Sequence, residues 1–185
     1  MSNMTRIAIH GAAGRMGRAL IEASAGHDDL QVSAALEAAQ SPAIGSDAVL
    51  LGEQAAGVTV SALSADNTDF DVLIDFTRPE PSLAAVNICR EAGKGMVIGT
   101  TGYSEADRAN VIEAARGIPI VLAPNFSIGV NLSLKLIEMA AKALGDTVDI
   151  EVIGAHHRHK VDSPSGTALA MGKAAADALG RDLDK

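Results

Sequence analysis

The sequence predicts an α/β fold built on a doubly wound parallel sheet, followed by the first part of a smaller α+β domain. Short β-rich runs alternate with helical patterns along most of the 185 residues, and this alternation is the signature of βαβ units. Hydrophobic residues make up 48% and aromatic residues only 2%, so Val, Ile, Leu and Ala must build the core, as in a buried parallel sheet. Glycines follow the first β-rich run at a fixed spacing, where such sheets bind ligands.

The elements follow one another in the order that this fold requires. Strands are predicted at 6–10, 30–36, 71–76, 96–100, 119–124 and 148–154. Residues 38–66 are less regular, and we expect a long connection with a short strand near 57–60. Helices are predicted from apolar faces at helical spacing, formed by Met16, Ala19, Leu20 and Ala23; by Ala85, Ile88, Cys89 and Ala92; by Val130, Leu134, Ile137, Ala141 and Leu144; and by Leu169, Gly172, Ala176 and Leu179.

Composition excludes several classes of function. A net charge of -8 and a pI near 5.0 argue against a nucleic-acid or anionic-membrane partner, because such binding neutralises phosphates with cations. The single Cys89 predicts no intrachain disulfide and no metal knuckle. The first residues do not read as a signal peptide, and no apolar run is long enough to span a membrane. We therefore expect a cytoplasmic protein.

The first chemical motif is "IAIHGAAGRMGRAL". Gly11, Gly14 and Gly17 lie where the first strand meets its helix, so the backbone can approach a ligand and the helix N-terminus can meet an anion. Glu37 ends the second strand 20 residues after Gly17, where an acid can bind both hydroxyls of an adenosine ribose. The alternative is a glycine turn that only permits tight packing, but the combination favours a Rossmann-like dinucleotide site. Ala38 offers no cation for the 2'-phosphate of NADPH.

Later strands end in further candidate contacts. The stretches "DFTRPE", "GTTGYS" and "APNFSIGVN" each follow a predicted strand, and the carboxyl edge of a doubly wound sheet is where ligands bind. Arg78 could equally be solvated on a surface turn, and Gly99, Thr100 and Thr101 could form a plain turn.

A cationic cluster, "HHRHK" at 156–160, contains three of the five histidines. His156 and Lys160 share one side whether this segment is a strand or a helix. The following "SPSGT" predicts a helix capped by Ser163, with Pro164 in its first turn. The N–H groups of Gly166 and Thr167 would then face an anion such as a carboxylate. A protonatable histidine, a lysine and a helix N-terminus predict a site for a carboxylated substrate that accepts a proton.

Three alternatives remain for this cluster. The histidines could bind a metal, although no carboxylate or Cys lies at ligand spacing, and we predict no metal site. The cluster could be a solvated charge run. The helix cap could be purely structural.

Five stretches, in order along the chain, resemble the 4-hydroxy-tetrahydrodipicolinate reductase (dihydrodipicolinate reductase) family of bacterial lysine and diaminopimelate biosynthesis. They are "GAAGRMG", "DFTRPE", "GKGMVIGTTG", "APNFSIGVN" and "AHHRHKVDSPSGTA", and the last is highly specific. The resemblance implies reduction of a cyclic imine dicarboxylate by NADH or NADPH. It also implies a homotetramer.

The resemblance assigns roles residue by residue. His156 would be the proton donor and acceptor, Lys160 a second proton donor, and His157, Gly166 and Thr167 would bind the substrate carboxylates. The cofactor would be held by Gly11, Ala12, Ala13, Gly14, Arg15, Met16, Glu37, Arg78, Gly99, Thr100, Thr101, Ala123, Pro124, Asn125 and Phe126. We expect NADH to be preferred, with NADPH possible.

The chain departs from the family in length. Members are about half as long again, so we expect residues 1–127 to form a dinucleotide-binding domain and 128–185 an incomplete substrate-binding and catalytic domain. Substrate turnover by this chain is expected to be poor. Two rival functions are a non-catalytic NAD-binding fragment and an NAD-dependent amino-acid dehydrogenase; the latter would explain the glycines but not "HHRHK" followed by "PSGT".

Overall fold

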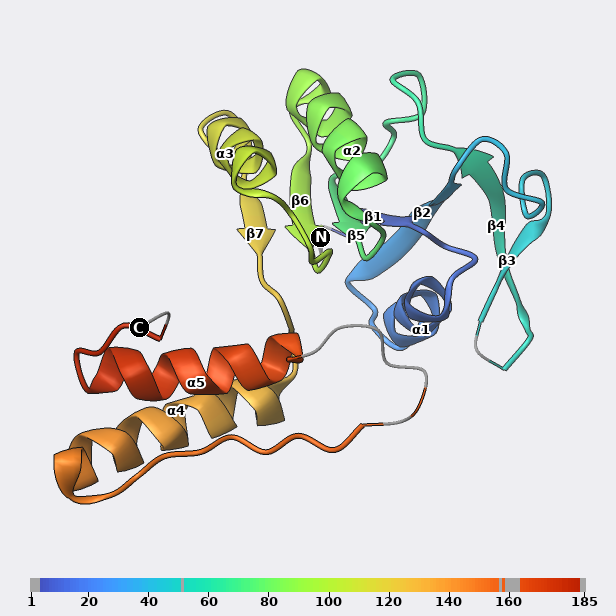
Figure 1. Ribbon diagram of the computed structural model, residues 1–185. Coiled ribbons are helices and arrows are strands. Elements are labelled where there is room, and N and C mark those ends of the chain that lie inside the picture. Colours follow the sequence, from blue (N-terminus) through green and yellow to red (C-terminus); the bar gives the residue numbers. More distant parts are fainter. Residues whose placement is uncertain (1–3, 51, 157, 159–163, 184–185) are drawn as a thin grey trace. The chain divides into compact units, whose positions relative to one another are not determined.

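The structure is a computed structural model that describes residues 4–50, 52–156, 158 and 164–183. The chain forms two compact units, Met1–Ala123 and Pro124–Lys185, drawn as ribbons in Figure 1. The first unit ends after its last strand, whereas the sequence placed the domain boundary after residue 127.

The first unit is an α/β structure built on a seven-stranded sheet with the order β3-β4-β2-β1-β5-β6-β7. All neighbouring strands are parallel except β3 and β4, which are antiparallel. The strands are β1 (Thr5–His10), β2 (Leu30–Glu37), β3 (Asp47–Val49), β4 (Ala55–Ala62), β5 (Val72–Asp75), β6 (Gly95–Ile98) and β7 (Ile120–Leu122). The sheet confirms the doubly wound fold class, and it adds β3, which lies in the region read as irregular.

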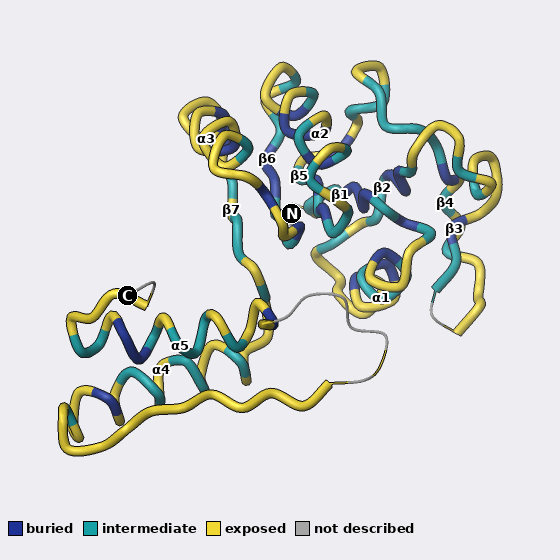
Figure 2. Tube along the Cα trace, viewed as in Figure 1, coloured by how far each residue is buried: buried dark blue, intermediate teal, exposed yellow. Residues whose placement is uncertain are grey.

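Helices cover both faces of this sheet. Helix α1 (Arg15–Ser24) packs on one face, where Ile21 joins Ile7 and Ile9 of β1 in one core cluster. Helices α2 (Pro79–Ala92) and α3 (Glu105–Ala114) cover the other face, where their buried apolar residues join Leu73 of β5 in a second cluster. The buried strand segments between these helices appear dark in Figure 2. Such two-sided cover is why the strands read as continuous apolar runs.

The buried side of α1 differs from the predicted one. Gly17, Ile21 and Ser24 are its buried residues, and Met16 is 47% exposed. Glycine and serine carry no apolar signal, so periodicity alone misplaced this face.

The second unit contains α4 (Ile128–Leu144), the 3₁₀ turn η1 (Gly145–Thr147) and α5 (Gly166–Ala178). The two helices pack along each other, and Ala141 of α4 and Ala175 and Ala176 of α5 are buried. Another face of α4 is apolar and exposed, with Ile128, Leu132, Leu136 and Met139 at helical spacing.

The predicted strand at 148–154 is wrong. These residues form no strand and no helix, and Ile153 is 91% exposed. Alternating Val and Ile residues predict a strand only where a neighbouring strand accepts their hydrogen bonds, and this segment pairs with none of the seven described strands.

Candidate functional site

The candidate cofactor site lies at the carboxyl edge of the first sheet. From central β1 the chain leads to β2 on one side, while β5 pairs with the other side of β1. The connections after β1 and β5 therefore diverge, and this topological switch point is where doubly wound sheets bind ligands. The loops 11–14, 76–78 and 99–101 all begin at this edge.

Close packing requires the glycines of the first loop. Gly11 has a φ of 79°, in the left-handed region that favours glycine. A Cβ on Gly17 would lie 2.2 Å from the carbonyl oxygen of Gly11 and 2.6 Å from the Cα of Ala12. Helix α1 therefore starts directly against the loop.

The N-terminus of α1 has no side-chain cap. Gly14 is the N-cap and offers no side-chain hydrogen bond, so the N–H groups of Arg15 and Met16, which have no acceptor within the helix, remain for an anionic ligand. Both residues are exposed. Arg18 bonds the same loop, since its Nε donates to the carbonyl oxygen of Ala13 at 3.2 Å.

Glu37, the last residue of β2, joins the glycine loop. Its Oε1 accepts the N–H of Ala13 at 2.9 Å, and its Oε2 accepts the N–H of Ala38 at 3.3 Å. These bonds fix the carboxylate beside the loop, and a carboxylate retains lone pairs for further donors. The structure thus brings Glu37 and the glycines together.

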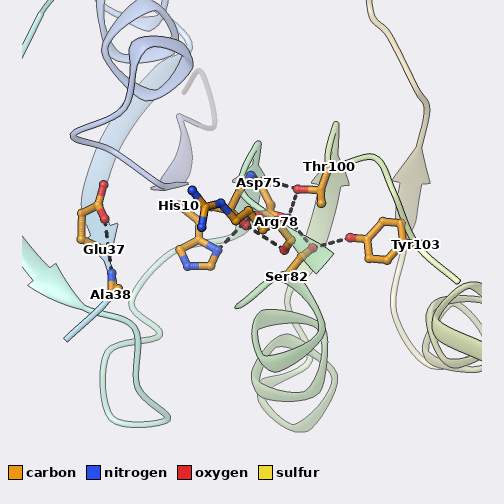
Figure 3. A network of polar contacts seen from close by, with 9 residues as sticks. His10, Glu37, Ala38, Asp75, Arg78, Ser82, Thr100 and Tyr103 are labelled. Carbon is orange, nitrogen blue, oxygen red and sulfur yellow. Dashed lines mark hydrogen bonds and ion pairs between the residues drawn. The ribbon is translucent and has the colours of Figure 1, made fainter. Parts of the chain in front are cut away.

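A buried polar network lies next to this loop (Figure 3). Asp75, at the end of β5, is fully buried. It accepts hydrogen bonds from His10 Nδ1 at 2.9 Å, Thr77 Oγ1 at 2.6 Å, Thr100 Oγ1 at 2.8 Å and the Ser82 hydroxyl. Burial by itself would raise the pKa of Asp75, but the hydrogen bonds from His10, Ser82 and Thr77 outweigh it and the pKa lies below its ordinary value.

Sequence reasoning found Thr100 but not its partners. His10 and Asp75 are 65 residues apart, yet each ends an apolar strand, and these strands are neighbours. The sequence did contain a signal for this pair, because His10 and Asp75 are each a polar residue at the end of an apolar run.

The other predicted loop residues also lie at this edge. Gly99 leaves room for the Phe76 ring, because a Cβ there would lie 2.1 Å from the ring. Thr101 and Arg78 are exposed, and Arg78 is the N-cap of α2.

Residues 123–126 divide between the units. Ala123 extends the β6–β7 pairing, since its N–H donates to the carbonyl oxygen of Ile98 at 3.1 Å. Pro124, Asn125 and Phe126 belong to the second unit. There Asn125 Oδ1 accepts the N–H of Ser127, the N-cap of α4.

The predicted catalytic cluster is described only in part. His157 and Lys160 lie outside the described residues. His156 is exposed, and its ring lies against Gly154, where a Cβ would be 3.0 Å from its Nε2.

Helix α5 begins later than predicted, with Ser165 rather than Ser163 as its N-cap. The Ser165 hydroxyl accepts the N–H of Ala168 at 3.1 Å. Gly166 and Thr167, both exposed, are the first two helical residues. Their N–H groups have no acceptor within the helix.

These features fit a dinucleotide. The uncapped helix, the glycine loop and the anchored carboxylate match the pyrophosphate and the ribose of a nicotinamide dinucleotide. Among the residues that the structure describes, no three His, Cys, Asp or Glu side chains lie close enough to hold a metal ion. No helix in that same part of the chain is long and apolar enough to cross a bilayer.

Comparison with known proteins decides the family. Residues 5–126 match the model "Dihydrodipicolinate reductase, N-terminus", and residues 129–184 match "Dihydrodipicolinate reductase, C-terminus". The chain belongs to the dihydrodipicolinate reductase family. This family is NAD(P)H-dependent, and the resemblance drawn from the sequence motifs is confirmed.

A solved structure of the same family agrees with this assignment, and a more distant one shares the fold. The chain is similar to a dipicolinate-bound dihydrodipicolinate reductase from Paenisporosarcina sp. TG-14, with 28% identity and a TM-score of 0.74 over 95% of this chain and 67% of that one. It shares the fold of the WlbA dehydrogenase from Chromobacterium violaceum, at 18% identity and a TM-score of 0.57 over 77% of this chain and 41% of that one.

Proposed function

We propose that this chain binds NADH at the carboxyl edge of its first sheet and binds it more tightly than NADPH. The anchored carboxylate of Glu37 carries the proposal. It would accept the two ribose hydroxyls of the adenosine, while the N-terminus of α1 would face the pyrophosphate. The loop 99–101, together with Arg78 and Ala123, would complete the cofactor site within the first unit.

Preference for NADH follows from charge. A 2'-phosphate would lie against the Glu37 carboxylate, and Ala38 supplies no cation to offset the repulsion. Arg18 already bonds the Ala13 carbonyl, whereas Arg15 is exposed and is the cation that could still approach. Calorimetric titration with both cofactors tests the proposal, and tighter binding of NADPH would overturn the preference.

We further propose the family's reaction, the reduction of dihydrodipicolinate to tetrahydrodipicolinate, as the activity of this chain. His156 would donate the proton, Lys160 would be a second donor, and His157 and the N–H groups of Gly166 and Thr167 would bind the carboxylates. The N-terminus of α5 supports the last role. Bound NADH would supply the hydride.

Replacement of the proton donor tests the mechanism. We expect His156→Gln to lower turnover about a hundredfold, as for loss of a general acid, with the affinity for NADH unchanged. Lys160→Met should do the same and also raise the KM for the dicarboxylate if Lys160 screens its charge. Equal loss of NADH binding in His156→Gln would contradict a role limited to proton transfer.

A non-catalytic NAD-binding protein is the second candidate. The segment that leads to His156 is exposed and outside any strand, so the proton donor lacks a rigid support, and we expect slow turnover. Oxidation of NADH with freshly generated dihydrodipicolinate distinguishes the candidates, because only the reductase consumes NADH. A cytoplasmic location and a homotetramer remain predictions.

A further inference from the structure

His10 is a polar residue at the end of an otherwise apolar strand. Ile7, Ala8 and Ile9 precede it and are buried, and His10 itself is only 4% exposed. Gly11, the first glycine of the cofactor loop, follows it directly. A buried imidazole needs a hydrogen-bond partner, and Asp75 supplies one at the end of the neighbouring strand.

The chemistry of Asp75 fixes the direction of these bonds. An ionised carboxylate only accepts hydrogen bonds, so His10 must donate from Nδ1, and the hydroxyls of Thr77, Ser82 and Thr100 must also donate to it. Each carboxylate oxygen has two donors, His10 and Thr77 on Oδ1 and Ser82 and Thr100 on Oδ2. Charge-assisted hydrogen bonds of this kind are among the strongest in proteins.

This one carboxylate joins all three loops at the ligand edge. His10 precedes the glycine loop, Thr77 lies in the loop after β5, and Thr100 lies in the loop after β6. The loops also touch directly. The Thr77 N–H donates to Thr100 Oγ1 at 2.9 Å, and a Cβ on Gly11 would lie 2.9 Å from Thr77 Cγ2.

His10 is the only one of the four donors that comes from β1, since Thr77 and Ser82 follow β5 and Thr100 follows β6. In Figure 3 its second ring nitrogen points away from Asp75, so the bond depends on Nδ1 alone. Loss of Nδ1 would remove the side-chain bond between the glycine loop's strand and the other two loops.

We propose that His10 is a positioning residue of the cofactor site, holding the glycine loop in register with the loops 76–78 and 99–101 through the buried Asp75 carboxylate. The inference rests on the proposed binding of NADH. It adds that affinity depends on a preorganised platform and on a residue that need not touch the cofactor.

Two amide substitutions distinguish the effect of the hydrogen bond to Asp75 from the other effects of replacing the histidine. Asparagine carries its amide nitrogen as many bonds from Cβ as Nδ1, whereas the amide nitrogen of glutamine is one bond farther out. We therefore expect His10→Asn to retain the bond and His10→Gln to lose it, with similar polarity. His10→Leu removes the donor altogether, and His27→Leu is the matched control at an exposed histidine of the same unit.

The first measurement is the dissociation constant for NADH, followed by its fluorescence, with the melting temperature of each variant. His10→Leu should weaken NADH binding about tenfold, as expected for one lost hydrogen bond to a charged group. His10→Asn should bind close to the wild-type level, and His10→Gln should resemble His10→Leu. His27→Leu should bind like the wild type.

The second measurement is amide hydrogen exchange without cofactor. Peptides that cover 11–14 and 99–101 should exchange faster in His10→Leu and His10→Gln than in the wild type and His10→Asn. If His10→Leu does not fold, the comparison of His10→Asn with His10→Gln still tests whether the hydrogen bond to Asp75 positions the loops.

The outcomes separate this inference from the proposed function. If the wild type binds neither NADH nor NADPH, the proposed function is wrong, and the exchange rates alone judge the positioning role. If His10→Leu and His10→Gln lower the melting temperature but leave both NADH affinity and loop exchange unchanged, His10 is merely structural and the proposal is overturned. Equal binding by His10→Asn and His10→Gln would also overturn it.

Discussion

Gly17→Ala should damage both the stability and the cofactor site of the first unit. Gly17 is buried in the first turn of α1. An added Cβ would lie 2.2 Å from the Gly11 carbonyl oxygen and 2.8 Å from the carbonyl carbon of Ala12. These are backbone atoms, so no side-chain rotation can relieve the clash, and α1 must move away from the loop.

The change in the free energy of unfolding that Gly17→Ala causes is the sum of two opposing effects. Overpacking of a close contact costs about 1–3 kcal/mol, and we expect the upper part of this range because the contacting atoms are backbone. Alanine in place of glycine favours a helix by up to about 1 kcal/mol. The net loss of about 1–2 kcal/mol corresponds to a fall in melting temperature of about 4–8 °C for a unit of this size.

Thermal unfolding and NADH titration of the same preparation measure both effects. Gly129→Ala is the matched control, since Gly129 is also helical and its added Cβ would meet only Ser127 Oγ at 3.8 Å. The control should be neutral or slightly stabilising, and NADH should bind it normally. A Gly17→Ala protein with an unchanged melting temperature and unchanged NADH affinity would refute the close packing of α1 on its loop.

Three further predictions concern charge and burial. Because the pKa of Asp75 is lowered from 3.8, its stabilising effect should be complete above about pH 4 and disappear as the pH falls through the lower folded-state pKa. Urea unfolding should therefore show that Asp75→Asn is about 2 kcal/mol less stable than the wild type at pH 7, with a smaller difference in acid. A difference that does not change with pH would contradict this. Ala38→Arg should tighten NADPH binding about tenfold by pairing with the 2'-phosphate, and Ala39→Arg is the control. If calorimetry showed that both variants gain the same affinity for NADPH, position 38 would have no special role. Burial, with a smaller effect of the Asp75 charge, raises the pKa of Cys89 to about 12, so iodoacetamide should label Cys89 only after unfolding; rapid labelling of the folded protein would show that the core opens.

Most strands of the first unit could be predicted because each is marked by a short apolar run that can be recognised without knowing which strand it pairs with. Six of the predicted strands, including the short one near 57–60, and the glycine loop each depend on a short stretch of sequence, and Glu37 ends the second strand as expected. Pairing between distant segments is not local. The strand predicted at 148–154 failed for this reason, since alternating apolar residues do not identify a partner strand.

The buried network was missed for the same reason. His10 and Asp75 meet only because β1 and β5 are neighbours in register, with His10 opposite Asp75. The N-cap of α5 was misplaced by two residues because "SPSG" offers two serines. Both serines satisfy the rule for caps, and only the backbone decides between them.

The hydrogen bonds that anchor the Glu37 carboxylate favour NADH over NADPH in addition to the charge repulsion. Its two oxygens accept the N–H groups of Ala13 and Ala38, and a carboxylate has roughly four lone-pair sites. The ribose hydroxyls of NADH are donors, so they can occupy the remaining sites without displacing Ala13. A 2'-phosphate brings only acceptor oxygens and negative charge, so it can satisfy none of those sites and would have to push Glu37 off the glycine loop. The proposed preference for NADH and the position of the glycine loop therefore rest on the same pair of hydrogen bonds.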